Sequence, residues 1–399
     1  MTMTMPQRIL IAPSGFKESL SAAEVAEAIA RGARRCLPGV IVDIMPMVDG
    51  GEGTATALAE MTGGKLVPVR VCGPVGVEVD SHIALLGGEL SGTVAIDMAS
   101  AAGLRLVPRD LRDPTVTTTR GVGQLILAAL DAGAKRIIVG CGDSGTSDGG
   151  AGLVQALGGR ILDAEGRELA PGGAALADAA SLDLSGLDPR VAQTEIVVAC
   201  NMHNVLTGPR GVARVFGPQK GATPEQVERL SLALERWADL LMAECADNLG
   251  DVDIRTAGGS GASGGLGSAL AAVCGARLAT RFDVLLDPQL TGLGLDEAIA
   301  RADLVITAEG AIDYQTPRGK VPAEVARRSK RLGKPVLGMA GSIGQGASAV
   351  YDVGIDAIAG MIPVPMSLPE AIQNADDLLA DAAERAIRLI GLGCALAAR

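Results

Sequence analysis

The sequence predicts an α/β protein in which a doubly wound domain, built from both ends of the chain, carries a second, inserted α/β domain. Strands and helices alternate regularly near both termini, a rhythm typical of parallel sheets covered by helices. The rhythm is less regular in the middle of the chain. A chain of 399 residues is also longer than one ordinary core. We therefore expect residues 1–65 and 290–399 to form one domain and residues 66–289 to form the other.

The N-terminal part shows the α/β rhythm most clearly. An apolar run over residues 8–13 predicts a buried strand, and Ser21 with Glu24 forms a capping-box pattern at the start of a helix. Residues 40–45 predict the next strand, and the helix after it ends near Met61, before two glycines.

The remaining elements follow from the same patterns. Near the C-terminus we expect three strands, over residues 304–307, 335–339 and 358–362. We also expect three helices, which begin at Pro322, Gly346 and Leu368. In the middle we expect five strands, at 66–71, 81–86, 93–98, 136–141 and 195–200. Helices are expected over 124–131, from Ala151, and as one long segment over 223–248.

Composition excludes several classes of protein. Asp and Glu outnumber Lys and Arg by 46 to 35, so a basic nucleic-acid-binding face is not expected. The seven cysteines include no C-x-x-C pair, which indicates a reducing, cytoplasmic location. No apolar run predicts a signal peptide or a membrane span, so we expect no membrane partner.

Four glycine-rich loops are the strongest functional signals. They cover residues 49–54, 142–150, 258–267 and 308–320, and three of them carry acidic side chains. A glycine loop that enters a helix presents backbone N–H groups suited to phosphate, although many such loops are plain turns. Carboxylates beside phosphate indicate Mg²⁺, because the ion bridges the two groups.

Standard phosphate and nucleophile motifs do not account for these loops. The chain contains no G-x-x-x-x-G-K-[ST]. Residues 259–264 match G-x-G-x-x-G but follow no apolar strand, which argues against a dinucleotide site. Residues 261–265 match G-x-S-x-G, yet the histidines, His82 and His203, both lie upstream, whereas a hydrolase needs one downstream.

Seven ordered runs, spread over nearly the whole chain, resemble the bacterial glycerate kinase family that phosphorylates O2. They read IAPSGFKESLSAAEVAEAIARG, MVDGGEGT, TTTRGVGQLI, DSGTSDGGAGLVQALGG, NVLTGPRGVARVFGPQKGATPEQV, SGGLGSALAAVCGARL and ADLVITAEGAIDYQTPRGKVP. The resemblance implies a flavodoxin-like domain and an inserted α/β domain with the active site in a cleft between them. It also implies transfer of the γ-phosphoryl group of ATP to glycerate with Mg²⁺, giving 2-phosphoglycerate.

The chain departs from the family pattern at several loop positions. Ser14, Asn201 and His203 stand where the family usually has aspartate, and Ala311 stands where it usually has arginine. Asp143 and Ser147 replace the usual glycine and asparagine, while the neighbouring Ser144 and Asp148 are kept. These changes leave two alternatives open: a related kinase for another small hydroxy acid or alcohol, or a descendant that is no longer a kinase.

Charge requirements assign roles to individual loop residues. The transferred phosphoryl group needs cations and the acceptor hydroxyl needs a base, so the expected catalytic residues are Lys17, Asp49, Asp148 and Lys220. Asp49 and Glu52 are the expected Mg²⁺ ligands. The expected substrate and phosphate contacts are Ser144, Asn201, His203, Arg210, Gly264, Gly265, Glu309, Asp313 and Lys320. For Asp148 the alternative is a helix cap, and for each lysine it is an ordinary surface position. The expected partners are ATP and glycerate or a similar acid, and a homodimer is left open.

Overall fold

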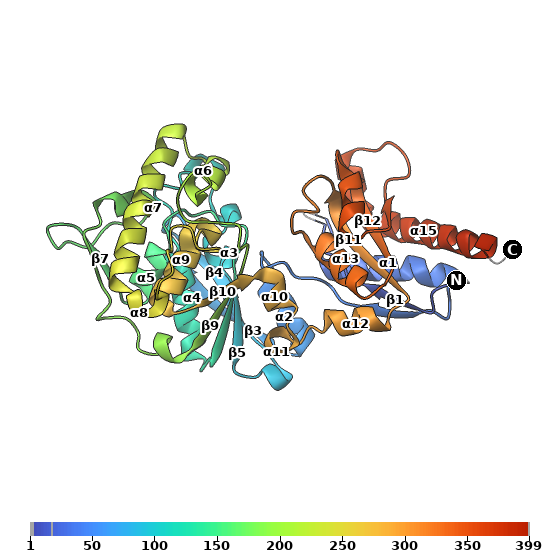
Figure 1. Cartoon of the computed structure of the whole chain (residues 1–399), viewed down its shortest axis with the longest axis horizontal. Helices are drawn as coiled ribbons and strands as arrows, with labels where there is room; N and C mark the ends of the chain where they lie inside the picture. Colours follow the sequence, from blue (N-terminus) through green and yellow to red (C-terminus); the bar gives the residue numbers. More distant parts are fainter. Residues whose placement is uncertain (1–3, 17–18, 398–399) are drawn as a thin grey trace. The chain divides into compact units, whose positions relative to one another are not determined.

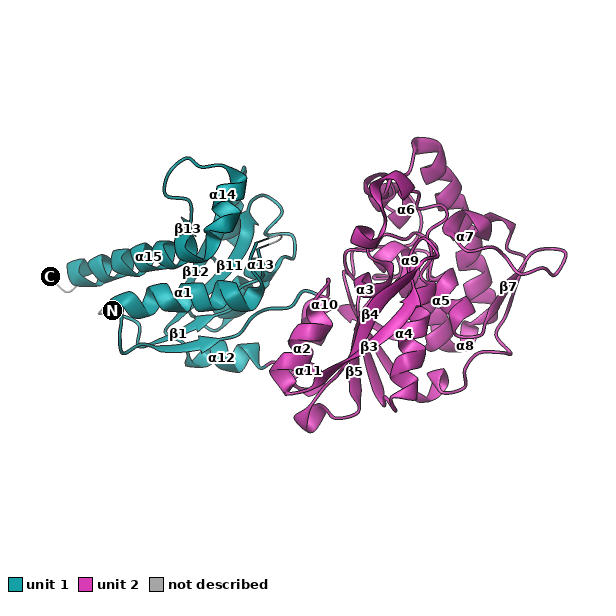
Figure 2. Ribbon diagram, turned by 180° about the vertical axis from the view of Figure 1, so that it is seen from behind, with its two compact units in different colours: residues 1–49, 294–399 teal, residues 50–293 magenta. Residues whose placement is uncertain are grey.

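The computed structural model describes residues 4–16 and 19–397, and these form two compact units. The first unit joins residues 1–49 to residues 294–399, and the second consists of residues 50–293 (Figure 2). The expected Lys17 lies outside the described residues.

The first unit is built on a five-stranded parallel sheet. Its strands are β1 (Arg8–Ile11), β2 (Ile41–Ile44), β11 (Leu304–Ile312), β12 (Val336–Ile343) and β13 (Ala357–Gly360). They lie in the order β13-β12-β11-β1-β2. Counted along this unit, that is the order 2-1-3-4-5 of the flavodoxin-like fold. The flavodoxin-like domain expected from both termini is therefore confirmed.

Five helices and one 3₁₀ helix complete the described part of this unit. They are α1 (Ala22–Cys36), α12 (Leu295–Arg301), α13 (Val321–Arg331), α14 (Leu368–Gln373) and α15 (Ala375–Ala397), with a 3₁₀ helix over Ala347–Val353. Helices α1 and α15 lie side by side (Figure 1). Gly32 allows this contact, because a Cβ there would lie 2.1 Å from the Ala380 carbonyl oxygen. The expected capping box of Ser21 and Glu24 begins α1.

The second unit contains a six-stranded mixed sheet. Its strands are β3 (Lys65–Cys72), β4 (Glu78–Leu85), β5 (Thr93–Asp97), β6 (Arg136–Gly140), β9 (Glu195–Cys200) and β10 (Arg277–Thr280), in the order β10-β9-β6-β5-β4-β3. The first four strands in that order run parallel to one another. Strand β4 pairs antiparallel with β5 on one side and with β3 on the other. Strands β7 (Arg160–Leu162) and β8 (Ser181–Asp183) form a separate pair.

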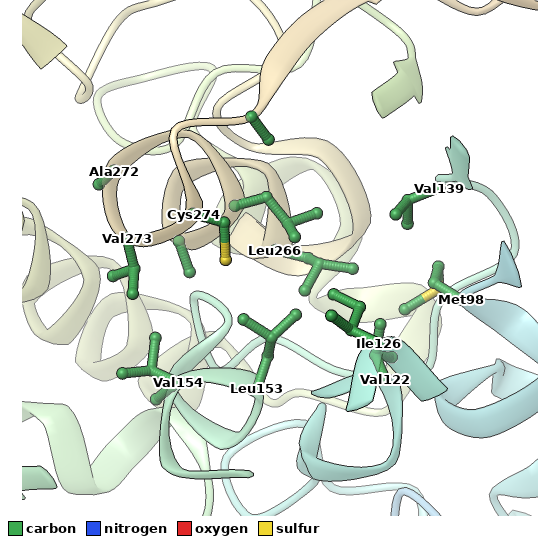
Figure 3. Packing of buried hydrophobic residues seen from close by; sticks show 14 of the residues in the cluster. Met98, Val122, Ile126, Val139, Leu153, Val154, Leu266, Ala272, Val273 and Cys274 are labelled. Carbon is green, nitrogen blue, oxygen red and sulfur yellow. The ribbon is translucent and has the colours of Figure 1, made fainter. Parts of the chain in front are cut away.

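The helices of the second unit enclose a large apolar core. They are α2 (Thr54–Thr62), α3 (Ala99–Ala102), α4 (Arg120–Asp131), α5 (Ala151–Ala156), α6 (Val212–Phe216), α7 (Pro224–Glu244), α8 (Ala246–Leu249), α9 (Ala262–Cys274), α10 (Arg281–Leu285) and α11 (Pro288–Thr291). Short 3₁₀ helices cover Gly88–Leu90, Leu104–Leu106, Arg109–Leu111, Gly173–Asp178, Val191–Gln193 and Pro218–Lys220. Figure 3 shows Val122 and Ile126 from α4 beside Leu153 from α5, Leu266 from α9 and Val139 from β6. None of the described helices is long and apolar enough to cross a membrane.

Some boundaries differ from those expected. The first unit ends at Asp49, not at residue 65, because the buried Asp97 carboxylate accepts hydrogen bonds from the Gly53 and Ala55 amides at the start of α2. The long helix expected over residues 223–248 is interrupted at Cys245, whose backbone is not helical. Strands β11 and β12 continue several residues beyond the expected strands, to Ile312 and Ile343, because they pair with each other over that length.

Candidate active site

Three loops come together at the carboxyl edge of the sheet in the second unit. The loop over residues 141–150 follows β6, the loop over residues 201–211 follows β9, and the segment over residues 258–265 leads into the regular part of α9. Ligands of open α/β sheets bind at this edge, because the strands end there and helices begin there. Glycine-rich turns that the sequence singled out therefore meet in one place.

Gly264 and Gly265 let the third loop pack directly on the first. Both have left-handed backbone, with φ of 75° and 94°. A Cβ on Gly264 would lie 1.9 Å from the Thr146 carbonyl oxygen, and one on Gly265 would lie 2.7 Å from Gly149 Cα. These two glycines, expected as phosphate contacts, thus have a structural reason to be glycine.

Asp148 is completely buried and accepts four hydrogen bonds. The Thr119 amide and hydroxyl donate at 2.8 and 2.9 Å, and the Gly150 and Gly152 amides donate at 3.2 and 3.1 Å. These donors belong to the first turns of α4 and α5. Burial raises the pKa of Asp148, while the bonds from Thr119 and the two glycines lower it. The geometry is that of a shared helix cap, the alternative considered for this residue.

Lys220 is the other charged side chain buried in these loops. It is 2% exposed, and its Nζ donates to Ser144 Oγ at 3.0 Å and to the Thr146 carbonyl oxygen at 2.6 Å. Burial lowers its pKa from an ordinary value of 10.5 to about 7, although the negative charge of Asp148 acts in the opposite direction. The structure therefore brings the expected residues Lys220 and Ser144 into direct contact.

The loop after β9 presents its polar groups to solvent. Asn201 Oδ1 accepts a hydrogen bond from the His203 amide at 3.0 Å, which forms a tight turn. Asn201, His203 and Arg210 are all exposed. Within the residues that the structure describes, Arg210 has no ion-pair partner. These three side chains are accessible to a soluble ligand.

The expected metal ligands lie on either side of the unit boundary. Asp49 is the last residue of the first unit, and Glu52 belongs to the second, where it forms an ion pair with Arg105. Across the described part of the chain, no three His, Cys, Asp or Glu side chains are grouped so as to hold a metal ion. This donor set does not build an all-protein metal cage.

A second polar cluster lies at the carboxyl edge of the first unit. Lys320 Nζ is 2.7 Å from Glu309 Oε1 and 3.9 Å from Asp313 Oδ1. Thr316 Oγ1 donates to Glu309 Oε2 at 3.1 Å. Burial raises the pKa of Glu309, while the Lys320 contact lowers it. The expected phosphate cation Lys320 is thus neutralised by the two expected acids beside it.

Two of the altered positions lie close to this cluster. Ser14 follows β1, and its hydroxyl donates to the Ala308 carbonyl oxygen at 3.0 Å. Ala311 lies within β11, opposite Ser342 of β12. Ser14 therefore follows β1 and Ala311 lies in β11, two adjacent parallel strands at the point where the strand order reverses, which is a usual ligand position in this fold.

Sequence reasoning missed the structural roles of three residues of the second unit. Asp143 and Ser263 have φ of 49° and 52°, and they are the non-glycine residues with left-handed backbone in the described part of the chain. The Thr119 hydroxyl, which completes the cap around Asp148, was also missed. The sequence did contain a signal for Asp143 and Ser263, because both stand inside glycine-rich runs. A non-glycine residue in such a run must adopt a backbone conformation that usually favours glycine.

Comparison with known proteins adds independent evidence. The model of the glycerate kinase family matches residues 9–391. A glycerate kinase of Bacillus subtilis (strain 168) is 46% identical over 390 residues, which cover 98% of each chain. The glycerate 2-kinase of Escherichia coli (strain K12) is 42% identical over 386 residues, 97% of this chain and 98% of the relative. A crystal structure from Salmonella typhimurium LT2, described as a glycerate kinase 2, has a TM-score of 0.83 at 45% identity and covers 97% of this chain and 99% of that one.

Proposed function

The chain belongs to the glycerate kinase family, and from that premise we propose that it transfers the γ-phosphoryl group of ATP to the 2-hydroxyl of glycerate. The products are 2-phosphoglycerate and ADP. The enzyme is a phosphotransferase with an alcohol group as acceptor. The choice of the 2-hydroxyl is supported by the name of the relative from Escherichia coli, a glycerate 2-kinase.

The contact between Lys220 and Ser144 is the observation that carries this proposal. Lys220 is too deeply buried to reach a ligand, but it donates to Ser144 Oγ and leaves the Ser144 proton available to a second acceptor. Ser144 lies in the loop after β6, at the edge where ligands bind. A hydroxyl fixed in this way donates to an oxygen of the transferred phosphoryl group, and such prearranged donors stabilise charge that develops during transfer. Lys220 is thus a positioning residue for Ser144.

The exposed loop after β9 supplies groups for the glycerate carboxylate. Arg210 carries the positive charge, and Asn201 and His203 add polar contacts. An arginine binds a carboxylate through two parallel hydrogen bonds, which fixes both position and orientation.

The acids of the chain fit a Mg²⁺ ion that arrives with the nucleotide. Mg²⁺ commonly uses one or two protein carboxylates together with substrate phosphates and water, and this needs no cluster of three protein ligands. Asp49 and Glu52 are the proposed ligands, and Glu52 would exchange its contact with Arg105 for the ion. When bound, Mg²⁺ neutralises part of the phosphate charge.

We also infer a cytoplasmic location. All seven cysteines are free thiols, which suits a reducing compartment.

A product-specific assay tests the proposed function. The purified full chain is supplied with ATP, Mg²⁺ and glycerate, and release of ADP is followed together with conversion of the product by enolase. Enolase dehydrates 2-phosphoglycerate and does not act on 3-phosphoglycerate. ADP release with an enolase signal is the expected result. ADP release without that signal contradicts the 2-position, and ADP release only with another hydroxy acid contradicts glycerate as acceptor.

A further inference from the structure

The contact between Lys220 and Ser144 joins a basic group to a hydroxyl. Lys220 Nζ lies 3.0 Å from Ser144 Oγ, which is within reach for the transfer of a proton. The ammonium form of the lysine donates to Ser144 Oγ, whereas the neutral amine carries a lone pair that accepts the Ser144 proton. Burial lowers the pKa of Lys220 to about 7, so both forms are present near neutral pH. The contact can therefore operate in either direction.

The backbone on both sides of Ser144 is held in place. The Leu104 amide donates to the Asp143 carbonyl oxygen at 2.9 Å, and the Gly145 amide donates to the Ala102 carbonyl oxygen at 2.8 Å. Ser144 is half-buried, and its loop follows β6 at the edge of the sheet where ligands bind. The hydroxyl is thus the end of the pair that a ligand can contact, and the fold fixes its position.

The surroundings of Lys220 allow the buried amine to hold a proton. Lys220 ends the 3₁₀ helix over Pro218–Lys220, which packs against α6, the loop after β6 and the segment before α4. The charged side chains on these segments are Arg112, Asp143, Asp148 and Arg214. Of these, the buried Asp148 carboxylate is the charge that acts on the Lys220 amine, and it raises the pKa that burial lowers. A proton taken up by Lys220 is therefore stabilised by an opposite charge inside the same unit.

We infer that Ser144 and Lys220 together form the general base of the reaction, an inference that rests on the proposed function. The 2-hydroxyl oxygen of glycerate forms a bond to the γ-phosphorus of ATP, and its proton passes to Ser144 Oγ. In the same step Ser144 gives its own proton to the lone pair of Lys220 Nζ. The bond between the γ-phosphorus and the bridging oxygen breaks, and its electron pair leaves with ADP. Ser144 is the catalytic residue that touches the acceptor, and Lys220 acts through it as the final proton acceptor.

Proton uptake converts Lys220 into the ammonium donor that holds Ser144. Ser144 Oγ then accepts from Nζ and presents its new proton to an oxygen of the phosphoryl group. The positive charge thus forms while negative charge develops during transfer, when a fixed donor stabilises it most. After the products leave, Lys220 returns the proton to water through Ser144.

The two possible roles of Lys220 predict opposite pH dependences. A base must be neutral, so the kcat/KM for glycerate, measured with saturating ATP and Mg²⁺, should fall as the pH decreases through about 7. A group that acts only as an ammonium donor must be protonated, so kcat/KM would instead fall as the pH rises through that value. The native chain alone gives this sign, and the test does not depend on the folding of a variant. A fall above pH 7 with none below it overturns the inference.

Substitutions assign the acid limb of the pH profile to this pair. Lys220→Met and Ser144→Ala should lose the limb, and their kcat should fall by about 10²- to 10⁴-fold. Ser144→Thr keeps a hydroxyl and should keep the limb. Lys220→Arg supplies a permanent cation that donates but cannot accept a proton, so a native kcat in this variant overturns the inference. Lys135→Met is the matched control and should behave like the native chain, because Lys135 is an exposed lysine of the same unit.

The same measurements distinguish this inference from the proposed function. A native chain that does not phosphorylate glycerate overturns both. An active native chain whose acid limb persists in Lys220→Met overturns only the role of the pair. Asp49→Asn is measured in parallel, and loss of the acid limb in that variant alone would assign the base to Asp49.

Discussion

Lys220 Nζ lies 3.0 Å from Ser144 Oγ and 2.6 Å from the Thr146 carbonyl oxygen, although only 2% of the lysine is exposed. Burial lowers the pKa of this amine to about 7. The chain therefore keeps a basic group below the loop that follows β6, where its amine donates to a hydroxyl and is shielded from solvent.

Replacing Lys220 should impair turnover more than substrate binding. Lys220→Met keeps the length and the apolar stem, but Ser144 Oγ and the Thr146 carbonyl oxygen lose their donor. We expect kcat to fall by about 10²-fold or more, comparable to the loss of a donor in an oxyanion hole, with a small change in the KM for glycerate. Ser144→Ala should show the same pattern, and the double variant should be little worse than either single one. Fully additive losses in the double variant would argue against a shared role.

The stability of the enzyme should depend on pH through Lys220. Its pKa is about 7 in the folded chain and close to the ordinary 10.5 in the unfolded chain. Between these values the unfolded chain binds a proton that the folded chain does not, so the free energy of unfolding should rise with pH across that window. The slope contributed by this group is at most about 1.4 kcal/mol per pH unit. The slope disappears below a pH of about 7, because both the folded and the unfolded chain then hold the proton. Urea unfolding at several pH values should give a flatter dependence for Lys220→Met, and equal slopes in both chains would contradict the shifted pKa.

Asp148 should contribute strongly to the stability of the second unit. In Asp148→Asn the side-chain NH₂ group faces backbone donors, and at least one amide among those of Thr119, Gly150 and Gly152 loses its acceptor. A buried donor without a partner costs about 1–3 kcal/mol, so we expect a loss of at least about 2 kcal/mol in urea unfolding. Hydrogen exchange should accelerate in the first turns of α4 and α5. Asp183→Asn, an exposed turn acid, is the control and should cost less than about 1 kcal/mol.

Gly264 and Gly166 offer a matched test of loop packing. Their φ values are similar, 75° and 78°, so alanine is conformationally strained at both positions. At Gly166 a Cβ meets nothing within 4 Å, and the cost should be about 1–2 kcal/mol. At Gly264 the Cβ would lie 1.9 Å from the Thr146 carbonyl oxygen, which would push apart the two loops of the site. Gly264→Ala should therefore lose both stability and kcat, whereas Gly166→Ala should lose only a little stability. Equal effects would show that the close contact is not needed.

Local signals in the sequence predicted most of the secondary structure. The capping boxes of Ser21 with Glu24 and of Thr223 with Gln226 depend on residues three positions apart, so they can be read directly from the chain. The break at Cys245 has no such signal, because helix propensity continues through it. The first unit boundary was also not predictable, because it depends on hydrogen bonds from α2 to Asp97, far away in the sequence.

The sequence indicated which residues come together in the candidate site better than it indicated what each of them contacts. Glycine loops and charged residues marked Asp148, Lys220 and Ser144, and the structure brings these into one cluster. The role of Asp148 depends on Thr119, 29 residues earlier, and on complete burial, neither of which a local pattern contains. Likewise, the sequence does not show that Glu309 lies 2.7 Å from Lys320, and the phosphate contact expected of Lys320 stays a prediction.

Arg210 should determine the affinity for the acceptor. Its guanidinium is exposed after the turn at Gly208, and no ion pair within the described residues holds it elsewhere. A charged hydrogen bond to a carboxylate is worth about 1.5–3 kcal/mol, which corresponds to about a 10- to 100-fold change in affinity. Arg210→Ala should therefore raise the KM for glycerate by that factor and change kcat little, since this binding is the same in the ground state and the transition state. Arg210→Lys should recover only part of the affinity, because an ammonium cannot form the two parallel hydrogen bonds of a guanidinium. Arg229→Ala, at an exposed position on α7, is the control and should leave the KM unchanged. If Arg210→Ala instead raises the KM for ATP alone, Arg210 contacts the nucleotide and the glycerate carboxylate must be bound by another cation.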